Sequence, residues 1–184
     1  MWEELAERIR KCRACSLSTS RKHVVIGEGG FRQKILLIGE APGFYEDLQG
    51  RPFVGNAGKI LDEMLSMVGW SREDVFITNV VKCRPPGNRR PRLEEIQKCG
   101  KFLEEQISLL GPRTIITLGD VATSFIFKKF GIRGGRISEV HGKQFKINNI
   151  SIVPMFHPAA ALHDPRKRKE MIEDWRKIKQ ILSD

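Results

Sequence analysis

The 184-residue sequence contains no apolar run approaching the roughly 18 to 20 residues that a membrane-spanning helix needs. Its N-terminus, Met1-Trp2-Glu3-Glu4, is acidic where a secretory signal peptide is basic. It also lacks internal repeats and the compositional bias of collagen-like or low-complexity chains. We therefore expect a soluble, intracellular protein of the cytoplasm, folded as a single domain over residues 1–184 and making no contact with a membrane.

Acidic residues are the minority among the charged ones. The chain has 22 Asp and Glu against 32 Lys and Arg, so its formal charge is +10. A positive field attracts polyanions, and neutralised phosphates release their counterions. Charge alone leaves nucleic-acid binding and a merely solvated basic surface equally open.

Cysteine is scarce, and its four copies are Cys12, Cys15, Cys83 and Cys99. In an intracellular protein, four cysteines are favoured as metal ligands over disulfides. The Cys12-x-x-Cys15 spacing lets two thiolates reach one centre, but a zinc ribbon would contain a second close pair. A 4Fe–4S cluster accepts looser spacing. Zinc, iron-sulfur and four unrelated buried or redox-active cysteines all remain open on spacing alone.

Apolar runs alternate with segments of helical period. Strands are expected at residues 34–38, 75–78, 113–118, 144–147 and 150–155, and helices near residues 2–9, 56–68, 93–110, 120–127 and 167–182. This alternation predicts an α/β fold with a mostly parallel sheet and helices on both faces. Ligands bind beyond the carboxyl ends of such strands, so the polar loops at Gly39, Asn79 and His157 are expected to meet in one crevice.

Each of these loops carries a feature suited to a planar polar ligand. The two glycines of residues 39–43 let a ligand approach the backbone closely. Phe53, between Pro52 and Gly55, can present a ring face, and the Asn79 amide offers one donor and one acceptor. Taken singly, each loop has an ordinary explanation: a tight turn, a core phenylalanine, a capping asparagine, a structural histidine at 157.

In combination the loops resemble the motifs of family 4 uracil-DNA glycosylases. The resemblance runs from Cys12 to Leu162, and its motifs are residues 39–43 with Glu46-Asp47, residues 50–55, Thr78-Asn79 and His157-Pro158-Ala159. It implies a three-layer α/β/α sandwich around a four-stranded parallel sheet. It also implies that the four cysteines at 12, 15, 83 and 99 hold a 4Fe–4S cluster with a structural role.

The resemblance implies that the protein flips uracil out of single- or double-stranded DNA and hydrolyses its N-glycosidic bond, leaving an abasic site for base excision repair. Phe53 would stack on the base, Asn79 would bind its edge, and His157 would donate a hydrogen bond to uracil O2. The implied substrate-binding residues are Glu40, Ala41, Pro42, Gly43, Glu46, Phe53, Asn79 and His157, with Glu40 and His157 catalytic.

One position departs from the best-known glycosylases of the superfamily. Ala41 stands where those enzymes carry a water-activating aspartate, and Glu40, or else Glu46, is the expected substitute. A relative that crosslinks covalently to uracil has an inserted basic loop after the second motif. Here Val81-Lys82 runs directly to Cys83, so ordinary turnover is expected.

Further expectations concern the DNA and the competing functions. Basic residues at 84, 89, 90, 92 and 166–169 would meet DNA unless they form solvated faces, Leu162 would fill the space left by the flipped base, and Tyr45 would exclude thymine. We expect a monomer, and a sliding-clamp contact is not readable from the sequence. The competing functions are a non-catalytic DNA-binding protein with an iron-sulfur or zinc site, and a glycosylase for another deaminated base such as hypoxanthine.

Overall fold

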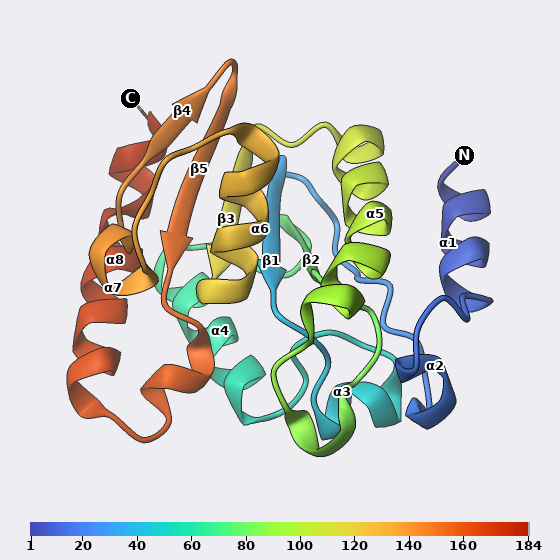
Figure 1. The fold of residues 1–184 in the computed structure, drawn as a ribbon. Helices are drawn as coiled ribbons and strands as arrows, with labels where there is room; N and C mark the ends of the chain where they lie inside the picture. Colours follow the sequence, from blue (N-terminus) through green and yellow to red (C-terminus); the bar gives the residue numbers. More distant parts are fainter. Residues whose placement is uncertain (184) are drawn as a thin grey trace.

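The structure is a computed structural model that describes residues 1–183. Its centre is a five-stranded sheet with the order β2-β1-β3-β5-β4 (Figure 1). The parallel strands are β1 (Ile35–Gly39), β2 (Val75–Asn79), β3 (Thr114–Leu118) and β5 (Ile150–Met155). These four strands agree with the implied four-stranded parallel sheet, to which β4 (Phe145–Ile147) adds a fifth strand that pairs antiparallel to β5. A two-residue turn joins them, with Asn148 at φ 54°, a conformation that asparagine tolerates well.

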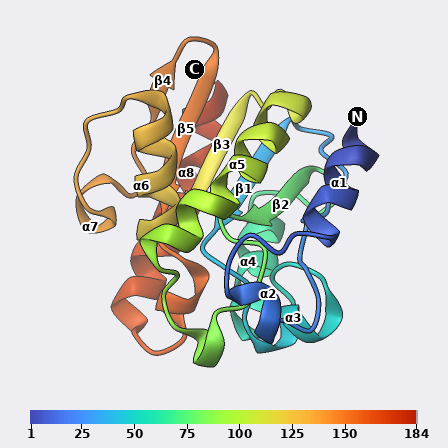
Figure 2. The same ribbon diagram turned by 45° about the vertical axis from the view of Figure 1, so that its right-hand side comes forward.

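Helices cover both faces of the sheet, as expected for a three-layer α/β/α sandwich (Figures 1 and 2). They are α1 (Trp2–Arg10), α2 (Leu17–Ser20), α3 (Phe44–Gln49), α4 (Asn56–Met67), α5 (Leu93–Leu110), α6 (Asp120–Phe130), α7 (Ile137–Val140) and α8 (Pro165–Ser183), with 3-10 turns η1 (Pro86–Asn88) and η2 (Pro158–Ala161). Within residues 1–183, no helix combines the length and the hydropathy that crossing a membrane requires.

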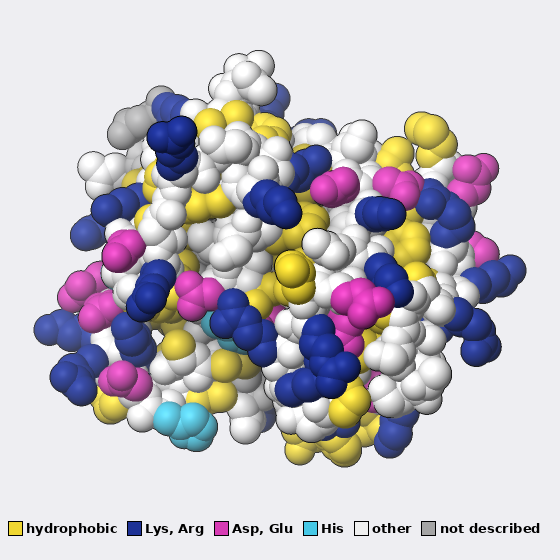
Figure 3. All heavy atoms as spheres, viewed as in Figure 1, with side chains coloured by type: hydrophobic (Ala, Val, Ile, Leu, Met, Phe, Trp, Pro, Cys, Tyr) yellow, Lys and Arg dark blue, Asp and Glu magenta, His cyan; other side chains and the backbone are white. Residues whose placement is uncertain are grey.

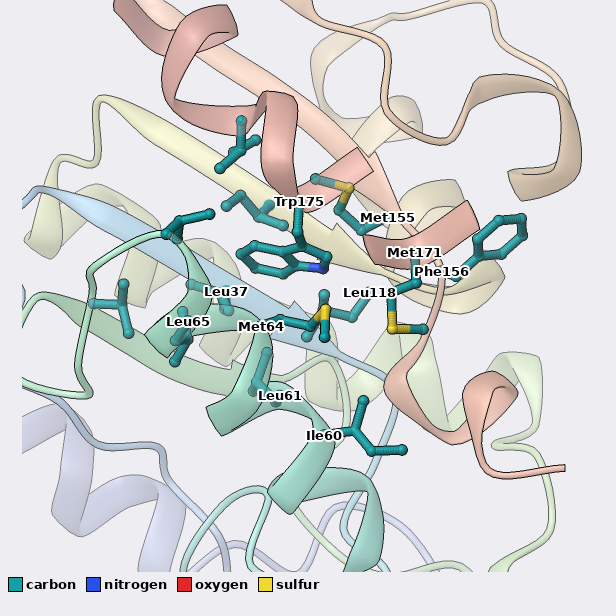
Figure 4. Packing of buried hydrophobic residues seen from close by; sticks show 14 of the residues in the cluster. Leu37, Ile60, Leu61, Met64, Leu65, Leu118, Met155, Phe156, Met171 and Trp175 are labelled. Atoms are coloured by element: carbon teal, nitrogen blue, oxygen red, sulfur yellow. The ribbon is translucent and has the colours of Figure 1, made fainter. Parts of the chain in front are cut away.

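Alternate residues of the strands face two separate cores. In β1, Leu37 packs with α4 and α8, whereas Leu36 and Ile38 pack with α5 and α6. Figure 4 shows the first core, where the Trp175 ring of α8 lies among the side chains of the sheet and of α4. Trp175 is 1% exposed. Burial on both faces explains why the parallel strands are continuous apolar runs.

The chain reverses its direction of winding between β1 and β3, which are neighbours. From β1 it crosses to β2 through α4, on one face, and from β3 it crosses to β5 through α6, on the other. Ligands of α/β sheets bind beyond the carboxyl ends of the strands at such a reversal, which here are the ends of β1 and β3. These ends lie at the lower side of the sheet in Figure 1.

The two outer edges of the sheet differ: one is covered by another segment of the chain, and the other is short. Residues 25–33 run along β2, where Glu28 and Ile77 exchange backbone hydrogen bonds of 3.0 and 2.8 Å. A Cβ on Gly29 would lie 1.9 Å from the carbonyl oxygen of Val75, so only glycine permits this close approach. The opposite edge is the three-residue β4, which carries an exposed Lys146.

Candidate active site

The carboxyl ends of β1 and β2 lie side by side and hold the first two predicted loops together. Gly39 pairs with Asn79, and the amide of Val81 donates to the carbonyl oxygen of Glu40 at 3.1 Å. A Cβ on Gly39 would lie 2.4 Å from Asn79 Oδ1 and 2.7 Å from Cζ of Phe53. Glycine is therefore required at 39, because the amide and the aromatic ring close directly over its backbone.

Asn79 contains an unsatisfied acceptor. The residue is 2% exposed, and its Oδ1 has no hydrogen-bond partner among residues 1–183. Leaving a buried polar atom unpaired costs about 1–3 kcal/mol. Native proteins retain such atoms mainly where function needs them, so the site is suited to a ligand that donates a hydrogen bond.

Phe53 is buried and held in an uncommon backbone conformation. It is 6% exposed, with φ at 51°. A Cβ on Gly58 would lie 1.9 Å from the carbonyl oxygen of Phe53, and Arg72 donates to the neighbouring Pro52 carbonyl at 2.9 Å. The first turn of α4 and Arg72 thus fix the loop and place the Phe53 ring beside Asn79.

The loop after β5 brings His157 to the same place. Its ring centroid lies 5.6 Å from that of Phe53, with 31° between the planes. The Ala159 amide donates to Nδ1 at 3.1 Å, so Nδ1 carries no proton and Nε2 carries the hydrogen. Burial lowers the pKa of His157 to about 4, although the Glu46 carboxylate opposes this change. At neutral pH the residue is a neutral imidazole with an Nε2–H donor.

Glu46 fastens two of the loops to each other. One carboxylate oxygen accepts from the Gly43 amide at 2.9 Å, and the other accepts from the amides of Val54 and Gly55 at 2.9 and 2.8 Å. The first of these bonds also caps the start of α3. Glu46 therefore links residues 39–43 to residues 50–55, and its oxygens are committed to backbone donors.

Glu40 is the second carboxylate of the site. It is partly buried, and burial raises its pKa, with Arg90 acting in the opposite direction and Asp120 in the same one. Asp120 was not among the predicted site residues. Its position two residues after β3, at the same edge of the sheet, was the available signal. The neighbouring Ala41 is partly buried and Pro42 is buried.

The four cysteines come together at a separate place. All of them line one cavity of about 20 Å³, with Cys83 and Cys99 buried and Cys12 and Cys15 partly buried. Arg21 donates to the sulfur of Cys83 at 3.2 Å. Burial raises the pKa of Cys99 to about 12. Within residues 1–183, no three His, Cys, Asp or Glu side chains are grouped to hold a single metal ion.

Lys and Arg side chains gather in the lower half of the face in Figure 3, over the loop between β2 and α5 and near the start of α8. Some of them are engaged within the protein. Arg89 makes two hydrogen bonds, of 2.7 and 2.9 Å, to the buried Glu95, and Arg168 pairs with Glu63 at 2.8 Å. Of the other predicted basic side chains, those at 90, 92, 166 and 169 are exposed, whereas Arg84 donates to Asn88 Oδ1 at 2.6 Å and Lys167 lies over the ring of Phe156.

Two apolar side chains singled out from the sequence lie at the surface. Leu162, directly after η2, is 39% exposed. Tyr45 is 53% exposed and packs edge-on against Phe44, with ring centroids 5.2 Å apart. A role for Tyr45 in excluding thymine stays a prediction.

Comparison with known proteins defines the class. The model of the uracil DNA glycosylase superfamily matches residues 26–179, and the chain belongs to this superfamily. Within it, the chain is 48% identical to the type-4 uracil-DNA glycosylase of Saccharolobus solfataricus, over 97% of this chain and 85% of that protein. It is 43% identical to the type-4 uracil-DNA glycosylase of Archaeoglobus fulgidus, over 97% of this chain and 92% of that protein. It is also 43% identical to the type-4 uracil-DNA glycosylase of Thermotoga maritima, over 99% of this chain and 95% of that protein.

Proposed function

We propose that this protein is a type-4 uracil-DNA glycosylase, which hydrolyses the N-glycosidic bond between uracil and deoxyribose in single- and double-stranded DNA. The observation that carries the proposal is the buried Oδ1 of Asn79, beside Gly39 and Phe53, which has no hydrogen-bond partner in the described part of the chain, residues 1–183. Uracil N3–H is a donor that this acceptor can receive, and cytosine has no hydrogen there. The names of the similar proteins support the same activity.

The pocket fits a flat base. The ring of Phe53 would provide a stacking surface, and Gly39 allows this ring and the Asn79 amide to close over its backbone. The backbone of residues 40–43 lines the side of the pocket, held in place by Glu46. DNA bases are reached only after they leave the stack, and a uracil opposite guanine leaves it at lower cost than a well-paired base.

His157 acts on the leaving base. As the N-glycosidic bond breaks, negative charge develops on uracil and positive charge on the sugar. The Nε2–H of neutral His157 donates to uracil O2, where part of that negative charge appears. Because Nδ1 is already hydrogen-bonded to the Ala159 amide, the donor is oriented before the substrate arrives. Removing one such donor costs on the order of 10²–10³-fold in rate.

Glu40 is our assignment for the carboxylate that orients water or balances the sugar cation. Glu46 is the poorer choice, because both of its oxygens already accept backbone hydrogen bonds. Ala41 provides no acid. Basic side chains outside the paired Arg89 and Arg168 would neutralise phosphates, and the exposed Leu162 would occupy the gap left by the base.

We propose that the four cysteines hold a 4Fe–4S cluster. Their common cavity supports a shared ligand. Four cysteine thiolates are the ligand set of a 4Fe–4S cluster, and Cys83 and Cys99 are too far apart in the sequence to form the second close pair of a zinc ribbon. Burial raises the pKa of Cys99 and so disfavours its thiolate form. A cationic centre bound beside the sulfur would restore the thiolate. The cluster would supply a crosslink between the N-terminal segment, the loop after β2 and α5.

One experiment tests the activity. Anaerobically purified protein is incubated with end-labelled oligonucleotides that contain one uracil, thymine, cytosine or hypoxanthine, and alkali reveals abasic sites. We expect cleavage at uracil alone, in both single and double strands. Cleavage at hypoxanthine only, or DNA binding without any cleavage, would contradict the proposal. Asn79→Ala and His157→Ala serve as controls with strongly reduced but measurable excision that still bind abasic DNA.

A second experiment tests the cluster. The purified protein should absorb broadly near roughly 400 nm and contain iron and acid-labile sulfide, as thiolate-held clusters do. Cys99→Ser should lose the absorbance, and Ser18→Ala, beside the same cavity, should keep it. Colourless protein with bound zinc would overturn the assignment.

A further inference from the structure

A lysine is completely buried between the cysteine site and the uracil pocket. Lys82 is 1% exposed and follows β2 by three residues. Its Nζ donates to Thr78 Oγ1 at 2.6 Å, to the backbone oxygen of Asn79 at 2.7 Å and to Gln106 Oε1 at 2.6 Å. An ammonium group has three donors, and all three are used.

The partners of Lys82 are themselves satisfied. The Thr78 hydroxyl and the Gln106 amide nitrogen both donate to the carbonyl oxygen of Ile26, at 2.8 and 2.9 Å. The network therefore joins the end of β2, the helix α5 and the segment that precedes β1. By contrast, the neighbouring Oδ1 of Asn79 has no hydrogen-bond partner among residues 1–183.

A buried lysine is a costly way to fill a core. Apolar side chains of similar volume are often equal or better for stability than a buried charge with its partners. The position of this charge suggests another reason for its presence. It holds the backbone oxygen of Asn79, the residue whose side chain faces Gly39 and Phe53.

We propose that Lys82 is a positioning residue for Asn79: it fixes the backbone at the end of β2 so that the Asn79 amide meets uracil in one orientation. Lys82 does not touch the base, and its effect passes through Asn79. The inference rests on the proposed function, because it concerns the residue that would read uracil.

A double-mutant cycle distinguishes this role from a purely structural one. Lys82→Met keeps the length of the side chain and removes its donors. It should lower the single-turnover rate of uracil excision about tenfold, within the range of measured couplings between contacting residues. It should weaken inhibition by free uracil by a similar factor and leave binding of abasic-site DNA within about twofold. In an Asn79→Ala background, Lys82→Met should cause no further loss.

Two further variants separate positioning from stability. Ile126→Ala empties a fully buried site in α6 and should destabilise the protein while leaving the excision rate of folded molecules unchanged. If Lys82→Met alone fails to fold, the double variant Lys82→Met/Gln106→Leu replaces it. The double variant removes both partners of one buried hydrogen bond and so leaves fewer unpaired polar groups in the core. It still lacks the donor to Asn79, so it should show the same excision defect.

A measurement without activity completes the test. The side-chain amide resonances of Asn79, identified by their loss in Asn79→Ala, should shift or double in the Lys82 variants but not in Ile126→Ala. Equal losses of excision in both Asn79 backgrounds, or unchanged excision and resonances, would overturn the inference. Absence of uracil excision by the wild type would contradict the proposed function instead, and the resonances would still decide the role of Lys82.

Discussion

The protonation of His157 offers the most direct test of the site. Its pKa falls from 6.5 to about 4 because the ring is buried. At about 1.4 kcal/mol for each pH unit, this difference corresponds to about 3 kcal/mol. Between pH 6.5 and pH 4 the unfolded chain binds a proton at this position that the folded chain excludes. The contribution of His157 to stability therefore decreases as the pH falls through this window and is constant above it.

The assay is NMR of protein labelled with ¹⁵N-histidine, in which the four histidines give separate patterns of ring nitrogens. His157→Gln removes one pattern and so identifies it. We expect a neutral ring protonated at Nε2 throughout the range above pH 5, because the Ala159 amide occupies Nδ1. Thermal melts at pH 7 and pH 5 provide a second measurement, since the wild type should lose more stability than His157→Gln.

Either of two results would refute the reasoning. One is a titration of His157 near pH 6.5, which would mean that its burial does not exclude the proton. The other is a ring protonated at Nδ1, which would leave Nε2 as an acceptor unable to stabilise charge on uracil O2.

Three further predictions follow from buried contacts. Gly39→Ala places a methyl group 2.4 Å from Asn79 Oδ1 and 2.7 Å from Phe53. Uracil excision should therefore fall at least about 100-fold, in a protein that still melts cooperatively. Near-normal excision would contradict the proposed arrangement of the site. Glu46→Gln weakens the hydrogen bonds from three backbone amides, so the free energy of unfolding in urea titrations should fall by about 1–3 kcal/mol. An unchanged midpoint would show that other contacts hold the two loops together. Trp175→Ala should cost about 3–5 kcal/mol of stability, measured by the same titration, and a cost below about 1 kcal/mol would mean that the core of α8 rearranges freely.

The long elements could be predicted from sequence because their periodicity is strong. The bounds of α5 and β5 agree with the expected ranges, and β1, β2 and β3 differ by about a residue at an end. The short helices α3 and α7 were not predicted. With six and four residues they show no period, and carboxylates three residues into each, Glu46 and Glu139, cap them. The helix α4 begins at Asn56, as expected, and Gly55 is its cap.

The predicted site residues of the pocket lie together in space, because the loops that carry them follow neighbouring parallel strands. Their chemical roles remain predictions. What sequence could not provide were contacts made through space. Lys82 reads as one polar residue after an apolar run, and only the fold brings Gln106, from a different helix, to its ammonium group. In the same way, the position of Glu46 in the sequence does not indicate that it accepts hydrogen bonds from the amides of Val54 and Gly55.

The covered edge at β2 bears on how the chain behaves when it is handled at high concentration. An uncovered parallel strand is a template on which another molecule can add a strand, and such additions start many aggregates. Here residues 25–33 of the same chain cover the backbone groups of β2. At the opposite edge, β4 has three residues, one of them an exposed lysine, and so presents few backbone groups to another strand. The sheet therefore offers a second molecule little free backbone on which to add a strand.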